Sequence, residues 1–187
     1  MSNVVAINAA ANKSIAVARA TSDEMLLQTI AKGDRTAMHV LYSRHHVRVY
    51  RFVLRMLRDT TMAEDLVSQV FLDVWRTARQ FEGRSQVSTW LLSIARFKAL
   101  TALRQRKHED IEQEDVLEIA DQADTPEASL DRSNTSAILR ACVAKLSPAH
   151  REIINLVYYH EKSVEEAGAI IGIPQSTVKT RMFYARK

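Results

Sequence analysis

Residues 163–187 read SVEEAGAIIGIPQSTVKTRMFYARK and combine a tight turn with a polar, basic helix face. Gly172 would supply the turn and Ile173 would fill the angle between two helices. Val178 and Met182, four residues apart, would face the first of these helices. Short polar side chains at a helix N-terminus and positive charge on its outer face suit phosphate binding and base reading in the major groove. The pattern predicts a DNA-binding helix-turn-helix, and the alternative is a helical hairpin with an ordinary basic surface.

The outward side chains of the second predicted helix are the candidates for DNA contact. Together with Lys187 they include four Lys or Arg and no acid. The candidates are Gln175, Ser176, Thr177, Lys179, Thr180, Arg181, Phe183, Tyr184 and Arg186.

A second basic stretch lies earlier in the chain, over residues 76–107. It contains eight Lys or Arg and one acid, Glu82, which gives a net charge of +7. Such charge can bind the phosphates of a partly opened DNA strand. Three nearby aromatic residues could stack on bases. At helical spacing Trp75 and Trp90 are predicted to be core residues instead, whereas both roles stay open for Phe81.

Helices must position both basic faces, and the sequence indicates where several of them begin. Residues 66–78 carry apolar side chains at three-and-four spacing, which predicts an amphipathic helix. Ser88 or Thr89 is expected to cap a long helix over 90–106. Capping boxes are predicted at Thr21-x-x-Glu24, Thr61-x-x-Glu64 and Ser163-x-x-Glu166.

Composition indicates an all-α fold. The chain has only 4 Gly and 3 Pro, fewer than sheets joined by tight turns need, and no strand-like alternation persists along it. Two small helical domains joined by an acidic linker are the economical division. The predicted organisation is a flexible extension over 1–20, a first helical module over 21–107, an acidic linker over 108–132 and a second helical module over 133–187.

Charge sets the linker apart from the modules. Residues 108–131 contain ten Asp or Glu and no Lys or Arg, so the chain, whose net charge is +4, carries +14 outside this segment. Such asymmetry suggests basic modules that meet a polyanion. The acidic run is either a solvated linker or a mimic that shields the basic surfaces, and the sequence does not separate the two.

Catalytic and metal sites are not expected. The six His form no HExxH or Glu-x-x-His pair, and neither Gly-rich phosphate loops nor nucleophile elbows occur in the sequence. Cys142, the only cysteine, excludes a disulfide framework and is predicted to be packed on an apolar helix face. No apolar run reaches the ~20 residues of a membrane span and no signal peptide opens the sequence. A cytoplasmic protein without cofactors or membrane insertion is expected.

Three blocks of the chain resemble one known family. Residues 64–107, which include EDLVSQVFLDVWRTARQFEGRSQVSTWLLSIARFKAL, resemble the second conserved region of bacterial sigma factors, most closely those of the extracytoplasmic-function (ECF) group. The segment GDRTAMHVLYSRHHVRVYRFVLRMLRD, residues 33–59, is similar to the first part of that region. The tail GIPQSTVKTRMFYARK resembles the fourth region. The resemblance covers about 22–107 and 133–187.

The resemblance implies an alternative, stress-responsive sigma factor that binds RNA polymerase core and directs it to promoters. Asp65, Gln69 and Asp73, which lie away from the apolar stripe, would dock on the clamp helices of the largest catalytic polymerase subunit. Many ECF factors are held inactive by an anti-sigma factor. The two modules are therefore expected to pack together when inhibited and to separate on polymerase.

The resemblance also assigns the two promoter elements. The second module would read the minus-thirty-five element, and the first would read and melt the minus-ten element. The loop before the STWL sequence would hold a flipped-out minus-ten base. Together with cations of the following helix, this gives Gly83, Arg84, Ser85, Gln86, Val87, Arg96, Lys98 and Arg104 as minus-ten candidates.

Two departures from the family pattern limit what is carried over. Phe97 stands where relatives usually have Asn, so a polar base contact is not expected there. Gly168 takes the place of the usual Ala in the helix-turn-helix, at a cost of roughly 1 kcal/mol in a helix interior. The alternative function is a stand-alone helix-turn-helix regulator, which would need no polymerase-docking face.

Overall fold

The computed structural model describes residues 21–112, 142–143 and 145–187. Within these ranges every regular element is helical, as predicted, and there is no strand. The elements are α2 (Asp23–Ile30), α3 (Arg35–Leu57), α4 (Thr60–Thr77), the 3-10 turn η1 (Ala78–Gln80), α5 (Val87–Glu112), α7 (Pro148–Ile154), the π-helical turn η2 (Asn155–Tyr159), α8 (Val164–Ile171) and α9 (Gln175–Ala185). The predicted N-terminal extension, most of the acidic linker and the predicted start of the second module at 133 lie outside the described residues.

Helix α3 is the centre of the first module. It contacts α2, α4 and α5 along its length, and Phe52 and Val53 on it are fully buried. The apolar stripe of α4 faces it, with Val70 and Val74 fully buried, which confirms the amphipathic helix predicted over 66–78. Burying each such side chain stabilises the fold by about 1.5–3 kcal/mol, so the stripe is a major contribution to the bundle.

Two of the predicted capping boxes are wrong by one or two residues. Helix α4 begins at Thr60, because Asp59 accepts a hydrogen bond from the N–H of the third helical residue at 3.0 Å. Thr61 is therefore inside the helix. Helix α2 is capped in the same way by Ser22 and not by Thr21, with a distance of 3.3 Å. In both cases a nearby side chain of the preferred capping type is the N-cap, and the helix starts one or two residues away from the predicted position.

The long helix α5 also begins earlier than predicted, at Val87. The backbone N–H groups of Thr89 and Trp90 donate to the carbonyl of Gln86 at 3.0 and 3.1 Å, which closes the first turn. Neither Ser88 nor Thr89 is the cap. Both hydroxyl groups instead contact side chains of the second module.

The aromatic residues predicted as core are confirmed. Trp75 and Trp90 are half-buried and pack against the apolar core of the first module. Phe81, for which both roles were open, packs against the same core with its ring centroid 5.2 Å from that of Trp90. Cys142 is exposed, so its predicted packing is wrong. The neighbouring Val143 is half-buried.

The second module is built as the predicted helix-turn-helix. Ser163 caps α8 in a capping box with Glu166, which confirms that prediction. Gly172 ends α8 at φ 78°, a left-handed conformation that favours glycine. Val178 of α9 is fully buried and Ile173 is half-buried against the same core, so the two helices meet as the sequence pattern predicts.

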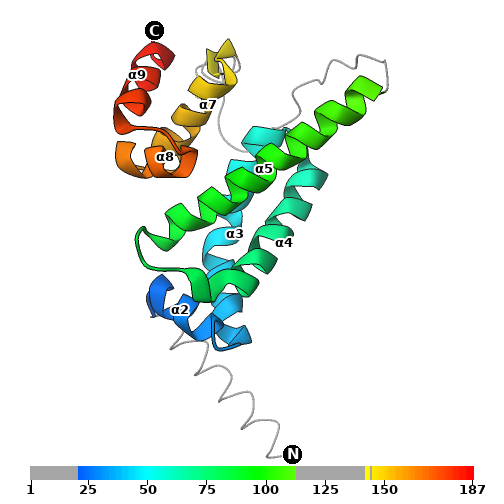
Figure 1. Cartoon of the computed structure of the whole chain (residues 1–187), viewed down its shortest axis with the longest axis vertical. Coiled ribbons are helices and arrows are strands. Elements are labelled where there is room, and N and C mark those ends of the chain that lie inside the picture. Colours follow the sequence, from blue (N-terminus) through cyan, green and yellow to red (C-terminus); the bar gives the residue numbers. More distant parts are fainter. Residues whose placement is uncertain (1–20, 113–141, 144) are drawn as a thin grey trace, which may run out of the picture.

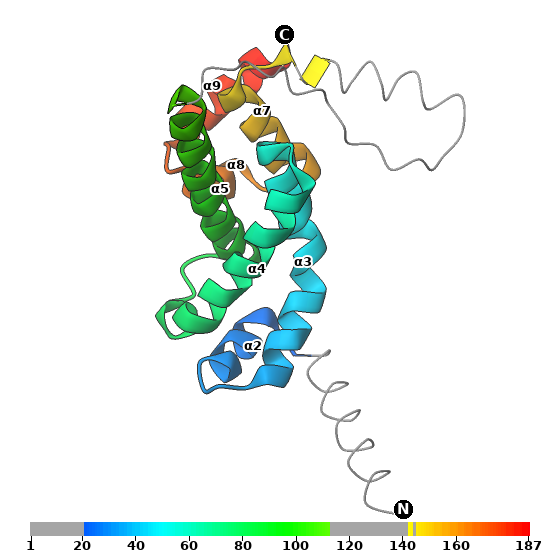
Figure 2. The same cartoon turned by 90° about the vertical axis from the view of Figure 1, so that its right-hand side faces the viewer.

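The two modules pack against each other. Helix α8 lies on α5, and Figures 1 and 2 both show α7 to α9 beside α5 at the end of the molecule opposite α2. Buried apolar residues of both modules form one cluster, to which the second contributes Ile153 and Leu156, both fully buried. Helix α5 continues to Glu112, past residue 107. In the described ranges no helix has the length and apolar character needed to cross a membrane.

Candidate nucleic-acid interface

Helix α9 carries its candidate DNA contacts on an exposed face. Val178 is its one buried residue, and the helix begins after Pro174 without a side-chain cap. Backbone N–H groups at such an N-terminus, together with the helix dipole, favour anions such as phosphate. Thr177 and Arg181 are half-buried, and the exposed candidates are Gln175, Ser176, Lys179, Thr180, Phe183, Tyr184 and Arg186.

The last turn of α9 turns two of its cations onto aromatic rings. Arg186 Nε donates to Tyr158 Oη at 2.7 Å, and Lys187 Nζ lies 4.9 Å from the centroid of the Phe183 ring. Cations over ring faces are attracted by the ring quadrupole. Lys179 therefore remains as the fully exposed cation nearer the N-terminal half of this face.

The loop predicted to hold a minus-ten base is exposed at its tip and anchored at its end. Gly83, with φ 70°, makes the bend, and the exposed Arg84 pairs with Glu82 at 2.6 Å. Gln86 is exposed and Ser85 is half-buried. Val87 is 1% exposed and lies in the apolar core, so it fixes the end of the loop and does not line an open surface.

The candidate cations of α5 are engaged inside the protein to different degrees. Arg96 Nε lies 2.6 Å from Glu152 Oε1 of α7, which is a contact between the modules. Lys98 Nζ lies 2.7 Å from Asp73 Oδ2 of α4. Arg104 is exposed. The structure therefore does not gather these three cations beside the loop, and Arg96 faces the second module.

The candidate polymerase contacts lie along one side of α4. Asp65 and Gln69 are exposed, whereas Asp73 is half-buried and paired with Lys98. Leu72 is 53% exposed on the same helix, one turn from Gln69. This leucine was not among the predicted contacts, because it lies outside the apolar stripe that faces the core. The spacing 65, 69, 72 would have been the signal for it.

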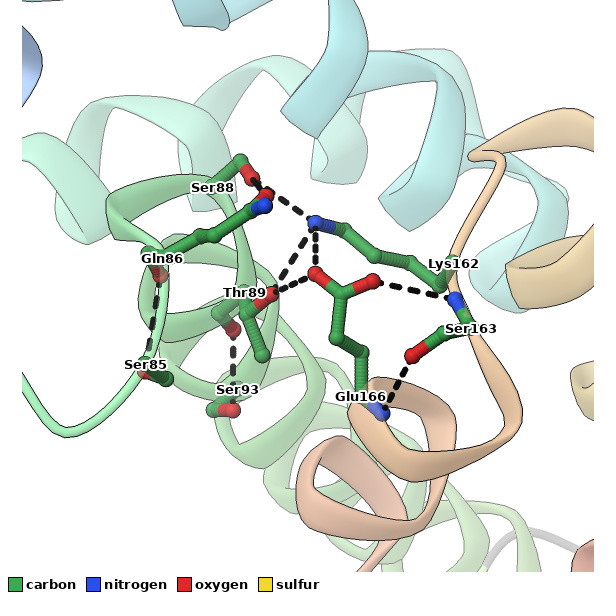
Figure 3. A network of polar contacts seen from close by, with 8 residues as sticks. All are labelled: Ser85, Gln86, Ser88, Thr89, Ser93, Lys162, Ser163 and Glu166. Atoms are coloured by element: carbon green, nitrogen blue, oxygen red, sulfur yellow. Dashed lines mark hydrogen bonds and ion pairs between the residues drawn. The ribbon is translucent and has the colours of Figure 1, made fainter.

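A buried polar cluster joins α5 to α8, and the sequence analysis did not identify it. Figure 3 shows Lys162 reaching from the segment before α8 to the first turn of α5. Its Nζ donates to Ser88 Oγ at 2.7 Å, to Thr89 Oγ1 at 2.9 Å and to Glu166 Oε1 at 2.8 Å. Thr89 Oγ1 in turn donates to Glu166 Oε1 at 2.7 Å. We call these four residues the lysine cluster.

The lysine cluster satisfies its charged groups. The side chain of Lys162 is 4% exposed and uses all three of its N–H donors, each on an oxygen of the cluster. Partial burial alone would raise the pKa of Glu166. Hydrogen bonds from Lys162 and Thr89, and from the backbone N–H of Ser163, outweigh burial and lower that pKa from 4.5 to about 2. The carboxylate is therefore held ionised beside the first turn of α5.

No group of His, Cys, Asp and Glu in the described ranges could hold a metal ion. The arrangement offers surfaces for macromolecules: an exposed recognition helix, an exposed loop and a helix face with acidic and apolar side chains. One of them, the loop, leads directly into the first turn of α5, where the modules are in contact.

Comparisons with known proteins cover both modules. The family model Sigma-70 region 2 matches residues 41–109, and the model Sigma-70, region 4 matches residues 142–187. RNA polymerase sigma factor CarQ of Myxococcus xanthus is 34% identical over 83% of this chain and 88% of its own length. ECF RNA polymerase sigma factor SigK of Mycobacterium sp. (strain KMS) is 31% identical over 87% of this chain and 86% of its own length.

A solved structure shares the arrangement of helices. The sigma factor RpoE of Bartonella quintana, solved in complex with the anti-sigma factor NepR, has a TM-score of 0.66 and 26% identity, covering 78% of this chain and 89% of that chain. Sigma factors initiate transcription and are not enzymes, which agrees with the expectation drawn from the residues. With both regions matched in order and curated relatives above 30% identity over most of its length, this chain belongs to the ECF family of RNA polymerase sigma factors.

Proposed function

We propose that this sigma factor directs RNA polymerase core to promoters through three separate surfaces, and that the packed arrangement of its modules is the inactive state. The observation that carries the proposal is the lysine cluster. It holds the second module against the first turn of α5, directly after the loop assigned to the minus-ten element.

The minus-thirty-five element is assigned to α9. Its exposed polar and basic face follows a tight turn, and its N-terminal N–H groups suit a phosphate. The specific candidates are Gln175, Ser176, Thr177, Lys179, Thr180 and Arg181, with Phe183, Tyr184 and Arg186 at the far end. Since Arg186 bonds Tyr158 within the second module, its role on DNA requires this bond to open.

The minus-ten element is assigned to the loop and to α5. Gly83, Arg84, Ser85 and Gln86 would form the pocket for a flipped-out base, with Val87 as its anchor in the core. Separation of the modules would release Arg96 from Glu152 and expose its charge for the phosphates of an opened strand. Arg104 is already exposed, whereas Lys98 stays paired with Asp73 within the first module.

Polymerase binding is assigned to α4. Asp65, Gln69 and Leu72 give this helix an exposed surface that combines negative charge, an amide and an apolar centre. Such a mixture is typical of protein interfaces. Asp73 fits a supporting role, because its carboxylate is held by Lys98. Because a sigma factor acts together with RNA polymerase, a cytoplasmic location is part of the same proposal.

An anti-sigma factor is the expected regulator. The similar Bartonella quintana sigma factor was solved with its anti-sigma factor bound, and in this chain the two modules pack together through buried contacts. An inhibitor that binds both modules would stabilise this arrangement, since a ligand that prefers one state shifts the population towards it. Polymerase would stabilise the separated one. A role in a stress response is part of the same proposal.

Run-off transcription with bacterial core polymerase on fragmented genomic DNA tests the function directly. We expect discrete new start sites, whose alignment would reveal both promoter elements. Failure to initiate, together with failure to co-elute with core polymerase, would favour the stand-alone regulator.

Two pairs of substitutions test the surfaces separately. Lys179→Ala with Tyr184→Ala is expected to weaken promoter binding about 10-fold or more and to leave binding to core polymerase unchanged, since each lost DNA contact costs about 1 kcal/mol or more. Asp65→Arg with Gln69→Ala is expected to weaken binding to core polymerase, while the free protein keeps its helicity. Identical effects of the two pairs on both measurements would contradict the assignment of separate surfaces.

A further inference from the structure

A second contact between the modules lies where His160 meets α3. The side chain of His160 is almost entirely buried, and its ring packs edge-on against Phe52 with centroids 5.4 Å apart. Neither ring nitrogen has a hydrogen-bond partner among the described residues. Buried polar groups without partners are uncommon in folded proteins and destabilise the state that contains them. The His160 contact therefore stabilises the packed arrangement less than an apolar side chain at the same position would.

The charged groups that act on His160 are all positive. Arg48, Arg51 and Arg55 come from α3, against which the ring packs, and Lys162 comes from its own segment. Arg55 lies over the ring of Tyr159, 4.0 Å from its centroid.

One of these cations is paired with an acid, because Lys162 forms an ion pair with Glu166 of α8 at 2.8 Å. Glu161, next to His160, is exposed. The positive charge that acts on the imidazole without a paired acid among these groups therefore comes from the three arginines of α3.

The backbone around His160 is irregular as well. It follows the π-helical turn η2, in which the buried Asn155 Oδ1 has no partner in the described part of the chain. Glu161, directly after His160, has φ 54°, a left-handed conformation that is strained for a residue with a side chain. Both irregularities cluster at functional or switching sites in proteins. The segment between α7 and α8 therefore has a strained backbone in the packed arrangement.

We propose that His160 is a proton-sensitive element of the module interface, and that its protonation separates the second module from α3. The imidazolium would be buried without an acceptor, and its charge would be added to that of the arginines on α3, the helix against which the ring packs. The consequence for promoter access rests on the proposed function, whereas the separation itself is a property of the chain alone.

The direction of the pH effect follows from the two states. Burial, and then repulsion by Arg55, Arg48, Lys162 and Arg51, lower the pKa of His160 from 6.5 to about 4 in the packed arrangement. In the separated arrangement the ring is exposed and its pKa returns to about 6.5. The separated state therefore binds the proton more readily. The packed state is favoured above pH 6.5 and loses population as the pH falls towards 4, by roughly 30-fold in the equilibrium at pH 5.

The distance between the modules is the direct readout. Spin labels on Ser68→Cys of α4 and Lys179→Cys of α9, both at exposed positions, would be introduced into the full chain carrying Cys142→Ser. The measurement is made in the urea concentration at which half of the molecules are separated at pH 7.5, so that a shift in either direction is visible. Between pH 7.5 and pH 5 we expect the ratio of packed to separated molecules to fall roughly 30-fold, with helicity retained.

Three variants decide whether His160 is the cause. His160→Leu should stay packed at pH 5, because it cannot gain a proton. Arg48→Gln with Arg51→Gln, which removes two exposed cations, should reduce the pH-induced shift, because the pKa of His160 in the packed state rises towards 6.5. His39→Leu, on the exposed side of α3, is the matched control and should separate like the parent protein.

An unchanged distance in the parent protein between pH 7.5 and pH 5 would overturn the proposal. So would a His160→Leu variant that still separates at pH 5. Glu166 does not confuse the result above pH 5, since the pKa of its carboxyl lies at about 2 when packed and its ordinary value is only 4.5. Run-off transcription at pH 7.5 is a separate readout, so a failure there would count against the proposed function and leave the distance result intact.

Discussion

The two contacts between the modules differ in how well they satisfy their polar groups. Where α8 meets α5, Lys162, Glu166 and Thr89 pair with one another at distances of 2.7–2.9 Å. Where η2 meets α3, His160 and Asn155 are buried with polar atoms that lack partners among the described residues. One interface therefore contains a contact that stabilises packing and a contact that weakens it.

This difference matters because a regulatory interface must hold and also release. A fully satisfied cluster alone would resist separation by polymerase. An unsatisfied contact alone would not keep the modules packed. The pair lets a modest input, such as a proton or a partner that binds one state, shift the population, since a coupling of a few kcal/mol is enough.

The largest expected effect is that of Lys162→Met. Methionine fills a similar apolar volume but leaves the Glu166 carboxylate without its cation, with the Thr89 hydroxyl and the backbone N–H of Ser163 as its remaining donors. Removing one partner of a buried ion pair costs about 3–5 kcal/mol, and because the side chain of Glu166 is 23% exposed we expect about 2–3 kcal/mol here. The measurement is the equilibrium between packed and separated modules at pH 7.5.

Lys179→Met, at an exposed lysine of α9, is the matched control and should leave that equilibrium unchanged. The dependence of stability on pH below 4.5 gives a second check. In the parent protein the ionised Glu166 stabilises the folded chain above pH 4.5, and this stabilisation is lost as the pH falls towards 2. The Lys162→Met variant should lack most of that acid transition. If Lys179→Met reduced the packed population as much as Lys162→Met, the effect could not be assigned to the lysine cluster.

Arg96→Gln is expected to have the next largest effect. Arg96 binds both carboxylate oxygens of Glu152, at 2.6 and 3.3 Å, with side chains 20% and 12% exposed. We expect packing to lose about 1–2 kcal/mol, because both charges are largely but not completely removed from water. Urea titration of the module distance measures it, with the exposed Arg104→Gln as control. The charge reversal Arg96→Glu with Glu152→Arg should restore part of the loss.

Much of the fold could be predicted from the sequence because it depends on local patterns. The stripe over 66–78, the Ser163 capping box and the turn at Gly172 each depend on residues within one or two turns of each other. Predictions were wrong at α4 and α5, where Asp59 and Gln86 begin the helix before the residue that the motif indicated. Several side chains near a helix start can accept the same N–H groups, and the sequence does not rank them.

The candidate site was only partly predictable for a different reason. Lys162 and Glu166 are four residues apart and read as an ordinary surface pair of a helix start. Their partner Thr89 is more than 70 residues away in the sequence, and no periodicity reports such a contact. The contact between Arg96 and Glu152 could not be predicted for the same reason, since the two residues are far apart in the sequence. The predicted DNA candidates on α9 needed no distant partner, which is why their exposure could be anticipated.

A third, smaller effect is expected inside the second module, at Gly168. The family pattern has Ala here, and Ala is the better helix former by about 1 kcal/mol. In this structure a Cβ on Gly168 would lie 2.9 Å from the backbone oxygen of Ile173, so the turn between α8 and α9 must shift. We expect Gly168→Ala to lower the free energy of unfolding by about 1 kcal/mol, despite its propensity.

Thermal unfolding of Gly168→Ala measures this effect, with Ala169→Gly as the contrasting change at an exposed position of the same helix. The module distance should hardly respond, because the atoms nearest to a Cβ on Gly168 belong to Ile173, Val178 and Gln175 of the second module itself. A strong change in the packed population would mean that the turn and the interface are coupled, and the two halves of the interface could then not be compared independently.

The smallest effect is expected from Arg55→Gln, in the weaker contact. The guanidinium stacks on Tyr159 at 4.0 Å, but burial and then repulsion by Arg51 oppose its charge, which is why the pKa of Arg55 is lowered. Loss of the stacking and relief of the repulsion largely cancel, so packing at pH 7.5 should change by less than about 0.5 kcal/mol.

At pH 5 the same variant should remain more packed than the parent protein, because one of the four cations around His160 is gone. Arg51→Gln, which removes an exposed cation without any stacking, is the control for charge alone. A loss at pH 7.5 as large as that of Lys162→Met would show that the α3 contact holds the modules as firmly as the lysine cluster. The two contacts would then stabilise packing equally, and protonation of His160 would not be expected to separate the modules.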